Sequence, residues 1–344
     1  MELGWLRKGT TRVLTRSRNF LLKNRKMKLK TGSPLARKIF GRTIRAFSIS
    51  FWVMVIAFAL MRVTPGDPAA TRLGAGAEEE AIAALREQLG LNVNPVQQFI
   101  NYMRDLLQGD FGTSLVSGLP VSKIITNSFP LTLTYIGFSF LFAFLISIPI
   151  GVLIGWSNRA SWVYTFRTIT SVVIATPNFF IAMVAILFFS VQRDWAPVFG
   201  YEPGFPGNMR YLWLPIAINT LILVSIISRV LLASVIDTRS EEFVETGIIR
   251  GVSRIRFFWF YILKPSLAPT IVLMSYMMGT MLGATVILET IFSLPGVGRE
   301  LVGAVLASDY PVVQGILIFF GVITVFLSFF GDLFAYLLDR RVKI

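Results

Sequence analysis

Residues 241–269 read EEFVETGIIRGVSRIRFFWFYILKPSLAP, and the first half of this stretch is too charged to cross a bilayer. Gly247 and Gly251 interrupt any helix there, at a cost of about 1 kcal/mol each relative to alanine. Five aromatic residues follow at 257–261, and such a run is typical of a membrane–water interface. The stretch predicts two short helices joined by a glycine bend on a membrane face, a shape that suits docking into a groove of a soluble partner.

The rest of the chain is strongly apolar, and this decides its class. Of the 344 residues, 54% are hydrophobic and 15% are charged, whereas soluble domains carry about 25% charged residues. Several apolar runs are about 20 residues long, the length that crosses a bilayer as a helix. Strands of a membrane β-barrel would alternate in polarity, and these runs do not. We therefore predict an all-α, polytopic membrane protein.

Six apolar runs predict six transmembrane helices. These spans are residues 46–61, 131–156, 169–191, 212–236, 267–288 and 312–338. Pro177 and Asn178 lie within the third of them. The first two spans are separated by an acidic region, residues 64–130, in which the pattern predicts helices at 78–90 and 95–108.

Basic residues are concentrated in segments that alternate along the predicted topology. Residues 1–45 hold 14 of the 33 lysines and arginines, and the loops 157–167 and 237–264 are also basic. The positive-inside rule places these segments and both termini in the cytoplasm, and places 64–130 and 289–311 outside. We expect a basic tail, 1–45, and a transmembrane domain, 46–344. The tail could be a membrane-surface helix, a solvated segment or a transit peptide.

The net charge of +14 would also suit binding to nucleic acid. However, a basic segment beside a membrane span is explained more simply by topology and by attraction to anionic lipid. We therefore expect lipid contact and no nucleic-acid partner.

The sequence carries no signature of an enzyme. It has no cysteine and no histidine, which removes disulfides, thiolate nucleophiles, imidazole bases and the usual zinc ligands. It also lacks a GxxxxGK[ST] phosphate loop and a GxSxG elbow. We expect no catalytic residue, cofactor or metal in this chain, so a partner must supply the energy for any uphill transport.

Ionisable side chains inside the spans are few. They are Arg229 in the fourth span, Glu289 at the end of the fifth and Asp332 in the sixth. Charge in lipid is costly and often functional, but Arg229 and Asp332 could pair with each other or reach the interface. The scarcity of buried carboxylates argues against a carrier coupled to protons or sodium.

The loop at 241–269 resembles the EAA motif of permease subunits in bacterial ABC importers. Glu245, Gly251, Leu263 and Pro265 fit that motif, with the proline one position late. The residues at 246–249, Thr-Gly-Ile-Ile, depart from its usual small and basic residues. Other segments resemble the B-type permease subunits of oligopeptide and dipeptide importers: RVTPGDP (62–68), LGL (89–91), GDFGTS (109–114), TPNFF (176–180), LP (214–215), ETIFSLPGVGR (289–299) and DYPVVQG (309–315). The resemblance covers about residues 40–344.

This resemblance implies the type I ABC importer permease fold and a heteromeric importer in the bacterial cytoplasmic membrane. The expected partners are a second permease, two ATPase subunits that bind ATP and Mg²⁺, and an extracytoplasmic binding protein. Contact with an ATPase is expected at Glu241, Glu242, Glu245, Gly247, Arg250, Gly251 and Arg254. Contact with the binding protein is expected at Asp110, Thr113, Arg299 and Asp309. The substrate class implied is peptide, although similar permeases serve oligosaccharides and nickel complexes.

Polar residues within the spans are candidates for a translocation path. They are Asn178, Asn219, Ser225, Ser275, Tyr276 and Thr280. Most such residues only form hydrogen bonds between helices. Two other classes stay open at this point: a stand-alone carrier, which would transport without ATP, and a structural membrane scaffold, which would not transport.

Overall fold

The computed structural model describes residues 34–63, 68–74, 76–88, 92–157 and 159–338. Across these ranges the chain forms helices and loops without any strand, apart from one isolated bridge between Thr113 and Pro120. The all-α prediction is therefore confirmed. The chain divides into two units, Met1–Arg45 and Ala46–Ile344. The basic tail expected at 1–45 falls largely outside the described residues.

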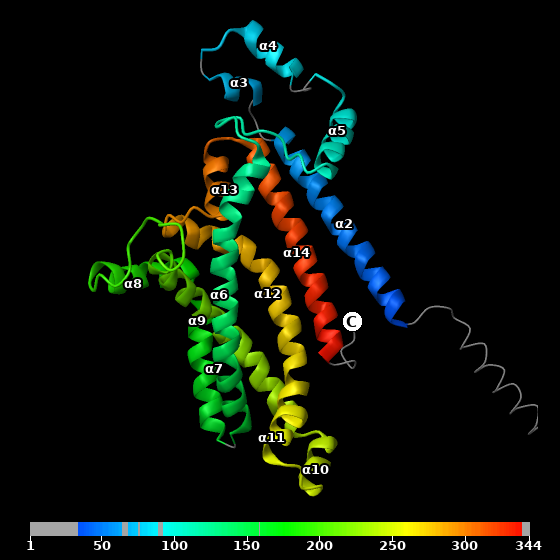
Figure 1. The fold of residues 1–344 in the computed structure, drawn as a ribbon, viewed down its shortest axis with the longest axis vertical. Helices are drawn as coiled ribbons and strands as arrows, with labels where there is room; N and C mark the ends of the chain where they lie inside the picture. The colour runs from blue at the N-terminus through cyan, green and yellow to red at the C-terminus, as the bar shows by residue number, and fades with distance from the viewer. Residues whose placement is uncertain (1–33, 64–67, 75, 89–91, 158, 339–344) are drawn as a thin grey trace, which may run out of the picture. The chain divides into compact units, whose positions relative to one another are not determined.

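Four helical segments within the described ranges are long and apolar enough to cross a membrane (Figure 1). They are α6 (Val121–Trp156), α9 (Met209–Arg239), the run of α11, η2 and α12 (Arg254–Ile291), and the part Tyr310–Gly331 of α14 (Tyr310–Leu338). A bent pair, α7 and α8, makes a fifth if it counts as one span. Helix α2 (Pro34–Val63) holds a shorter apolar segment, Thr43–Ala59. The predicted number of six spans is thus not confirmed.

The third predicted span, 169–191, is wrong as a single straight helix. Helix α7 already begins at Ala160 and ends at Ala175, and the axis then turns by 93° into α8 (Asn178–Ala185) and the π-helical segment η1 (Ile186–Val191). Pro177 causes this break, because proline lacks an N–H donor and forces the preceding residue out of helical geometry. Thr176 accordingly has an extended backbone, with ψ of 125°.

Glycines allow the membrane helices to approach one another closely. A β-carbon on Gly151 of α6 would stand 2.9 Å from Cγ of Leu231 in α9, and one on Gly155 would stand 2.9 Å from Cβ of Val235. Helix α12 packs against α14, where the Thr324 hydroxyl donates to the Gly279 carbonyl at 3.1 Å. Close approach through small residues is the usual basis of helix packing within membranes.

Shorter helices lie at the two ends of this membrane core (Figure 1). At one end, here called the α10 end, are α10 (Glu242–Ile249), α11 (Arg254–Arg256) and the π-helical segment η2 (Phe257–Leu263). At the other, the α13 end, are α3 (Pro68–Leu73), α4 (Glu79–Gln88), α5 (Pro95–Leu107) and α13 (Val297–Leu306). The two helices predicted at 78–90 and 95–108 are confirmed as α4 and α5. Asn94 caps α5 by accepting from the Val96 amide at 2.9 Å.

Candidate functional site

The glycine bend predicted in the 237–264 loop is present. Gly251 has a φ of +64°, a left-handed conformation that β-carbons disfavour. The Val252 amide donates to the Gly247 carbonyl at 3.3 Å, and the Gly251 amide donates to the Ile248 carbonyl at 3.0 Å. These two bonds are the Schellman arrangement that ends a helix and reverses the chain. They fix where α10 stops and how α11 leaves it.

One side of α10 is packed firmly against the membrane core. Val244 is buried, and Gly247 lies against the ring of Tyr261 in η2, which stacks on Phe257 with centroids 5.6 Å apart. The buried cluster includes Ile262 and Leu263 of η2. It reaches the end of α6 at Val152 and the end of α9 at Leu231 and Val235. One continuous buried cluster therefore joins α10 to the ends of both membrane helices.

The opposite side of α10 and α11 is open. Ile248, Ile249 and Ile255 are 62%, 79% and 76% exposed. Most of the residues predicted to contact an ATPase are exposed near these isoleucines. They are Glu241, Glu242, Glu245, Arg250, Gly251 and Arg254. An apolar centre with a charged rim is the composition of a protein–protein interface. Gly247 is instead buried, so its part in such a contact is to bring α10 against η2.

The open face of α12 differs from that of its neighbours. Beyond Lys264, its exposed residues are Pro269, Tyr276, Thr280, Gly283, Ile287 and Thr290. These positions recur every three, four or seven residues and so form one stripe along the helix; we call them the α12 stripe. Between Leu131 and Leu153, the exposed residues of α6 are mostly large and apolar instead: Leu133, Leu141, Phe142, Leu145, Ile146 and Leu153, with Gly137 and Pro149 among them.

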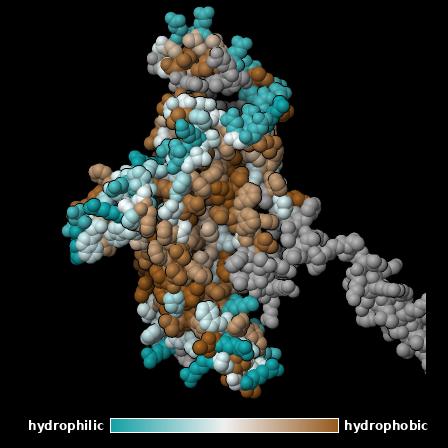
Figure 2. All heavy atoms as spheres, in the orientation of Figure 1, coloured by the Kyte–Doolittle hydropathy of each residue, from teal (hydrophilic) through white to brown (hydrophobic). Residues whose placement is uncertain are grey.

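Lipid contact explains the face of α6 but not the α12 stripe. Hydrophobic side chains dominate the middle of the molecule on the side shown in Figure 2, between hydrophilic ends. The stripe places a phenol and two threonine side chains within this membrane depth, and both threonine hydroxyls donate to carbonyls of α12 itself, at 3.0 and 2.7 Å. Such groups suit a polar path or a second membrane subunit better than hydrocarbon.

The predicted path residues do not all gather at the stripe. Tyr276 and Thr280 belong to it, whereas Asn219, Ser225 and Ser275 are buried within the subunit. The Ser225 and Ser275 hydroxyls donate to carbonyls of their own helices, those of Leu221 and Ile271, both at 2.8 Å. Asn178 is half-buried at the start of α8. A path role for these four residues stays a prediction.

Of the ionisable groups inside the spans, Arg229 donates to the Ser171 hydroxyl of α7 at 3.3 Å. The side chain of Asp332 lies outside what the structure describes. The pairing considered for these two residues therefore stays a prediction.

Asp309 ties a loop to the start of α14 at the α13 end. Its carboxylate accepts from the Ser114 hydroxyl and, at 3.0 Å, from the Leu115 amide. Asp309 is buried and faces the 112–121 loop in this structure. Its predicted contact with a binding protein stays a prediction. Asp110, Thr113 and Arg299 are exposed.

Glu289 is fully buried, and it caps the start of α13. One carboxylate oxygen accepts from the amides of Gly298 and Arg299, at 2.7 and 3.1 Å. The other oxygen accepts from the hydroxyl of Thr132 in α6 at 2.7 Å, and that hydroxyl accepts from the Val297 amide at 3.0 Å. The sequence shows Glu289 as a charge in a span but gives no sign of Thr132 as its partner.

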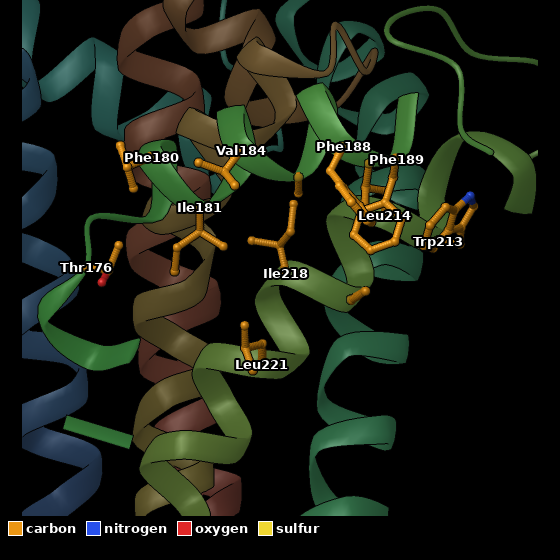
Figure 3. Close-up of a pocket in the computed structure, with 12 residues that line it drawn as sticks. Thr176, Phe180, Ile181, Val184, Phe188, Phe189, Trp213, Leu214, Ile218 and Leu221 are labelled. Carbon is orange, nitrogen blue, oxygen red and sulfur yellow. The ribbon is translucent and has the colours of Figure 1, made fainter. Parts of the chain in front are cut away.

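An apolar pocket of about 400 Å³ lies between α8, η1 and α9 (Figure 3). Phe180, Ile181, Phe189, Trp213 and Ile218 are among the side chains that line it. The hydroxyl of Thr176, at one edge, already donates to the Val172 carbonyl at 2.8 Å. The pocket therefore offers little to a hydrophilic molecule, and we do not place a substrate there.

Sequence reasoning missed Gly283, Ile287 and Thr290 as part of the stripe. Their three- and four-residue spacing from Thr280 was the signal that could have found them.

The described residues hold no group of acidic side chains arranged to bind a metal.

Comparison with known proteins gives matches over most of the chain. Residues 147–344 match the family described as "Binding-protein-dependent transport system inner membrane component", and residues 35–136 match the N-terminal family of such membrane components. A putative peptide transport system permease protein of Brucella abortus is 31% identical over 312 residues, covering 89% of this chain and 98% of the relative. A probable peptide ABC transporter permease of Sinorhizobium fredii is 29% identical, with the same coverage. A dipeptide transport system permease of Alkalihalophilus pseudofirmus is 29% identical, covering 88% and 98%.

Proposed function

Because the chain belongs to the family of binding-protein-dependent transport system inner membrane components, we propose that it carries peptides inward as one permease subunit of an ATP-driven importer. Membership makes it a multi-pass inner-membrane protein with the type I ABC permease fold, and it implies ATPase and binding-protein partners in general. The names of its relatives, which include peptide and dipeptide permeases, support peptide as the substrate.

The observation that carries the proposal is the pairing of an open face with a packed face in α10. Ile248, Ile249 and Ile255 form an apolar docking surface, and the opposite side of α10 joins the ends of α6 and α9. An ATPase that grips this surface moves both membrane helices. ATP and Mg²⁺ bind to the ATPase subunits, and this chain conveys their movement to the path.

The positive-inside rule then puts the α10 end and both termini in the cytoplasm. A homologous second permease faces the α12 stripe, so that the Tyr276 phenol lies toward a passing peptide while Gly283 leaves space for its side chains. The hydroxyls of Thr280 and Thr290 already donate to the Met277 and Val286 carbonyls of α12, so they offer the peptide an acceptor oxygen only. At the outer end, Asp110, Thr113 and Arg299 meet the binding protein. Transport proceeds by alternating access, and ATP binding shifts the equilibrium because the closed ATPases bind ATP more tightly.

The test is reconstitution of the complete importer in liposomes. We expect radiolabelled dipeptide or oligopeptide to accumulate only when ATP, the ATPases and the binding protein are all present. Import of an oligosaccharide or a nickel complex, with no competition from peptides, would show that the substrate class is wrong. Accumulation by the purified chain alone without ATP would establish a stand-alone carrier and overturn the proposal. Absence of transport in every assembly would identify a structural scaffold.

A further inference from the structure

Glu289 joins three elements that meet where the α12 stripe ends. Ile287 and Thr290, the last residues of the stripe, share a helical turn with Glu289, and α13 begins after the short turn that follows. A single carboxylate and the Thr132 hydroxyl accept from three successive amides, those of Val297, Gly298 and Arg299. These are the otherwise unpaired donors of the first turn of α13.

The first turn of α13 packs so closely against Glu289 and Val286 that no side chain could be added there; we call this packed position the seat of α13. A β-carbon on Gly298 would stand 2.7 Å from Cα of Val286, and one on Gly296 would collide with the Glu289 carboxylate. The far end of α13 is held as well, because the Asp309 amide donates to the Ala304 carbonyl at 2.8 Å and its carboxylate binds the 112–121 loop. The Glu289 carboxylate thus holds the start of α13, and the backbone amide of Asp309 holds its end.

A buried charge makes this seat an all-or-none arrangement. A carboxylate in an apolar surrounding is stable only while its hydrogen bonds are complete. If α13 moves partway, the Glu289 carboxylate loses the Gly298 and Arg299 amides, and the Thr132 hydroxyl loses the Val297 amide. The helix is therefore either fully seated or displaced with water around Glu289, and intermediate positions are disfavoured.

On the basis of the proposed function, we infer that Glu289 is the positioning residue of the outer closure of the path. Its carboxylate keeps α13 seated beside the end of the α12 stripe in the resting importer. Displacement of α13 from this seat opens the outer end when the binding protein and ATP engage. Glu289 acts through α13 and need not touch the substrate.

The absence of cysteine in this chain permits a direct test. The substitution Ile287→Cys introduces a single thiol, whose reaction with a membrane-impermeant maleimide in the assembled importer reports access to the outer end of the stripe. Val116→Cys, in the exposed part of the 112–121 loop, gives the control rate for a site that is open in every state. The test variants are Glu289→Gln and Thr132→Val, and Thr132→Ser is the conservative control that keeps the hydroxyl.

We expect Glu289→Gln and Thr132→Val to speed labelling at position 287 about tenfold, the change that loss of one charge-assisted hydrogen bond produces in a two-state equilibrium. They should also raise ATPase activity in the absence of the binding protein. Labelling at position 116 and the behaviour of Thr132→Ser should stay at the parental level. Parental labelling and ATPase activity in both test variants would overturn the inference.

A second measurement uses the unaltered chain, in case the variants fail to assemble. Hydrogen–deuterium exchange at the amides of 297–299 should be slow in the resting importer and fast with binding protein and a non-hydrolysable ATP analogue. Equal protection in the two states would also overturn the inference. Peptide import measured in the same preparation separates the outcomes, because failure to import peptide with a normal exchange response would fault only the proposed substrate.

Discussion

Gly247 of α10 lies so close to Tyr261 of η2 that a β-carbon on the glycine would stand 2.7 Å from Cε1 of the ring. The ring of Phe257 stacks on the ring of Tyr261, with centroids 5.6 Å apart. Helix α10 is therefore held against η2 by an aromatic contact that leaves no room for an added atom. Under the proposed function, movement at the α10 end would reach the membrane helices through this contact.

Gly247→Ala should disturb this contact without changing any charge. The methyl group forces the Tyr261 ring aside, and overpacking of this kind costs about 1–3 kcal/mol. We expect a lower thermal midpoint for the purified chain and weaker retention of the ATPase subunits during affinity purification. Tyr261→Leu in the same chain removes the clash and should restore much of the retention. An unchanged midpoint for Gly247→Ala would show that the ring has room to move.

Gly251→Val should uncouple ATP hydrolysis from transport while the protein stays in the membrane. A β-carbon at Gly251 meets nothing within 4 Å, so the effect is confined to the backbone, whose φ is +64°. A left-handed conformation costs an ordinary residue about 1–2 kcal/mol. The matched control is Gly251→Asn, because asparagine tolerates this conformation and should keep coupling. The ratio of peptide imported to ATP hydrolysed is the readout, and normal coupling in Gly251→Val would count against the bend as the coupling element.

Gly283→Leu should obstruct the path. Gly283 lies on the α12 stripe with open space around it, and Gly137 on the apolar face of α6 is equally open. If the leucine costs a passing peptide about 1–3 kcal/mol, import falls by roughly five- to 150-fold. Gly137→Leu, which adds the same side chain toward lipid, should import normally. Equal import by the two variants would place the stripe outside the path.

Asp309→Ala should loosen the 112–121 loop. The substitution leaves the Ser114 hydroxyl and the Leu115 amide without their acceptor in a buried corner, at about 1–3 kcal/mol for each unsatisfied group. We expect faster hydrogen–deuterium exchange at residues 112–121 and weaker dependence of ATPase activity on the binding protein. Asp110→Ala is the control, because Asp110 is exposed and its carboxylate accepts from the nearby Gly112 amide at 2.8 Å. If residues 112–121 exchange at similar rates in the two variants, Asp309 does not hold the loop more firmly than Asp110 does.

The site could be predicted only in part. The bend at Gly251 follows from local chemistry, because helix propensity and left-handed geometry act within a few residues. The open isoleucines and the buried Gly247 do not follow, since their burial depends on where Tyr261 and Val235 come to lie. For the same reason the buried Ser225 and Ser275 could not be told from the exposed Thr280 by residue type.

The sequence by itself determined the class of the protein, its helical spans in outline and the glycine bend at Gly251, because the cost of exposing polar backbone to lipid and the conformational preference of glycine are local properties. The tertiary structure alone decided that Pro177 bends the third span by 93° instead of being accommodated within it. It alone also joined Thr132 to Glu289 across 157 residues of chain. Hydrogen bonds between distant segments depend on how helices pack, and no spacing along the sequence encodes that distance.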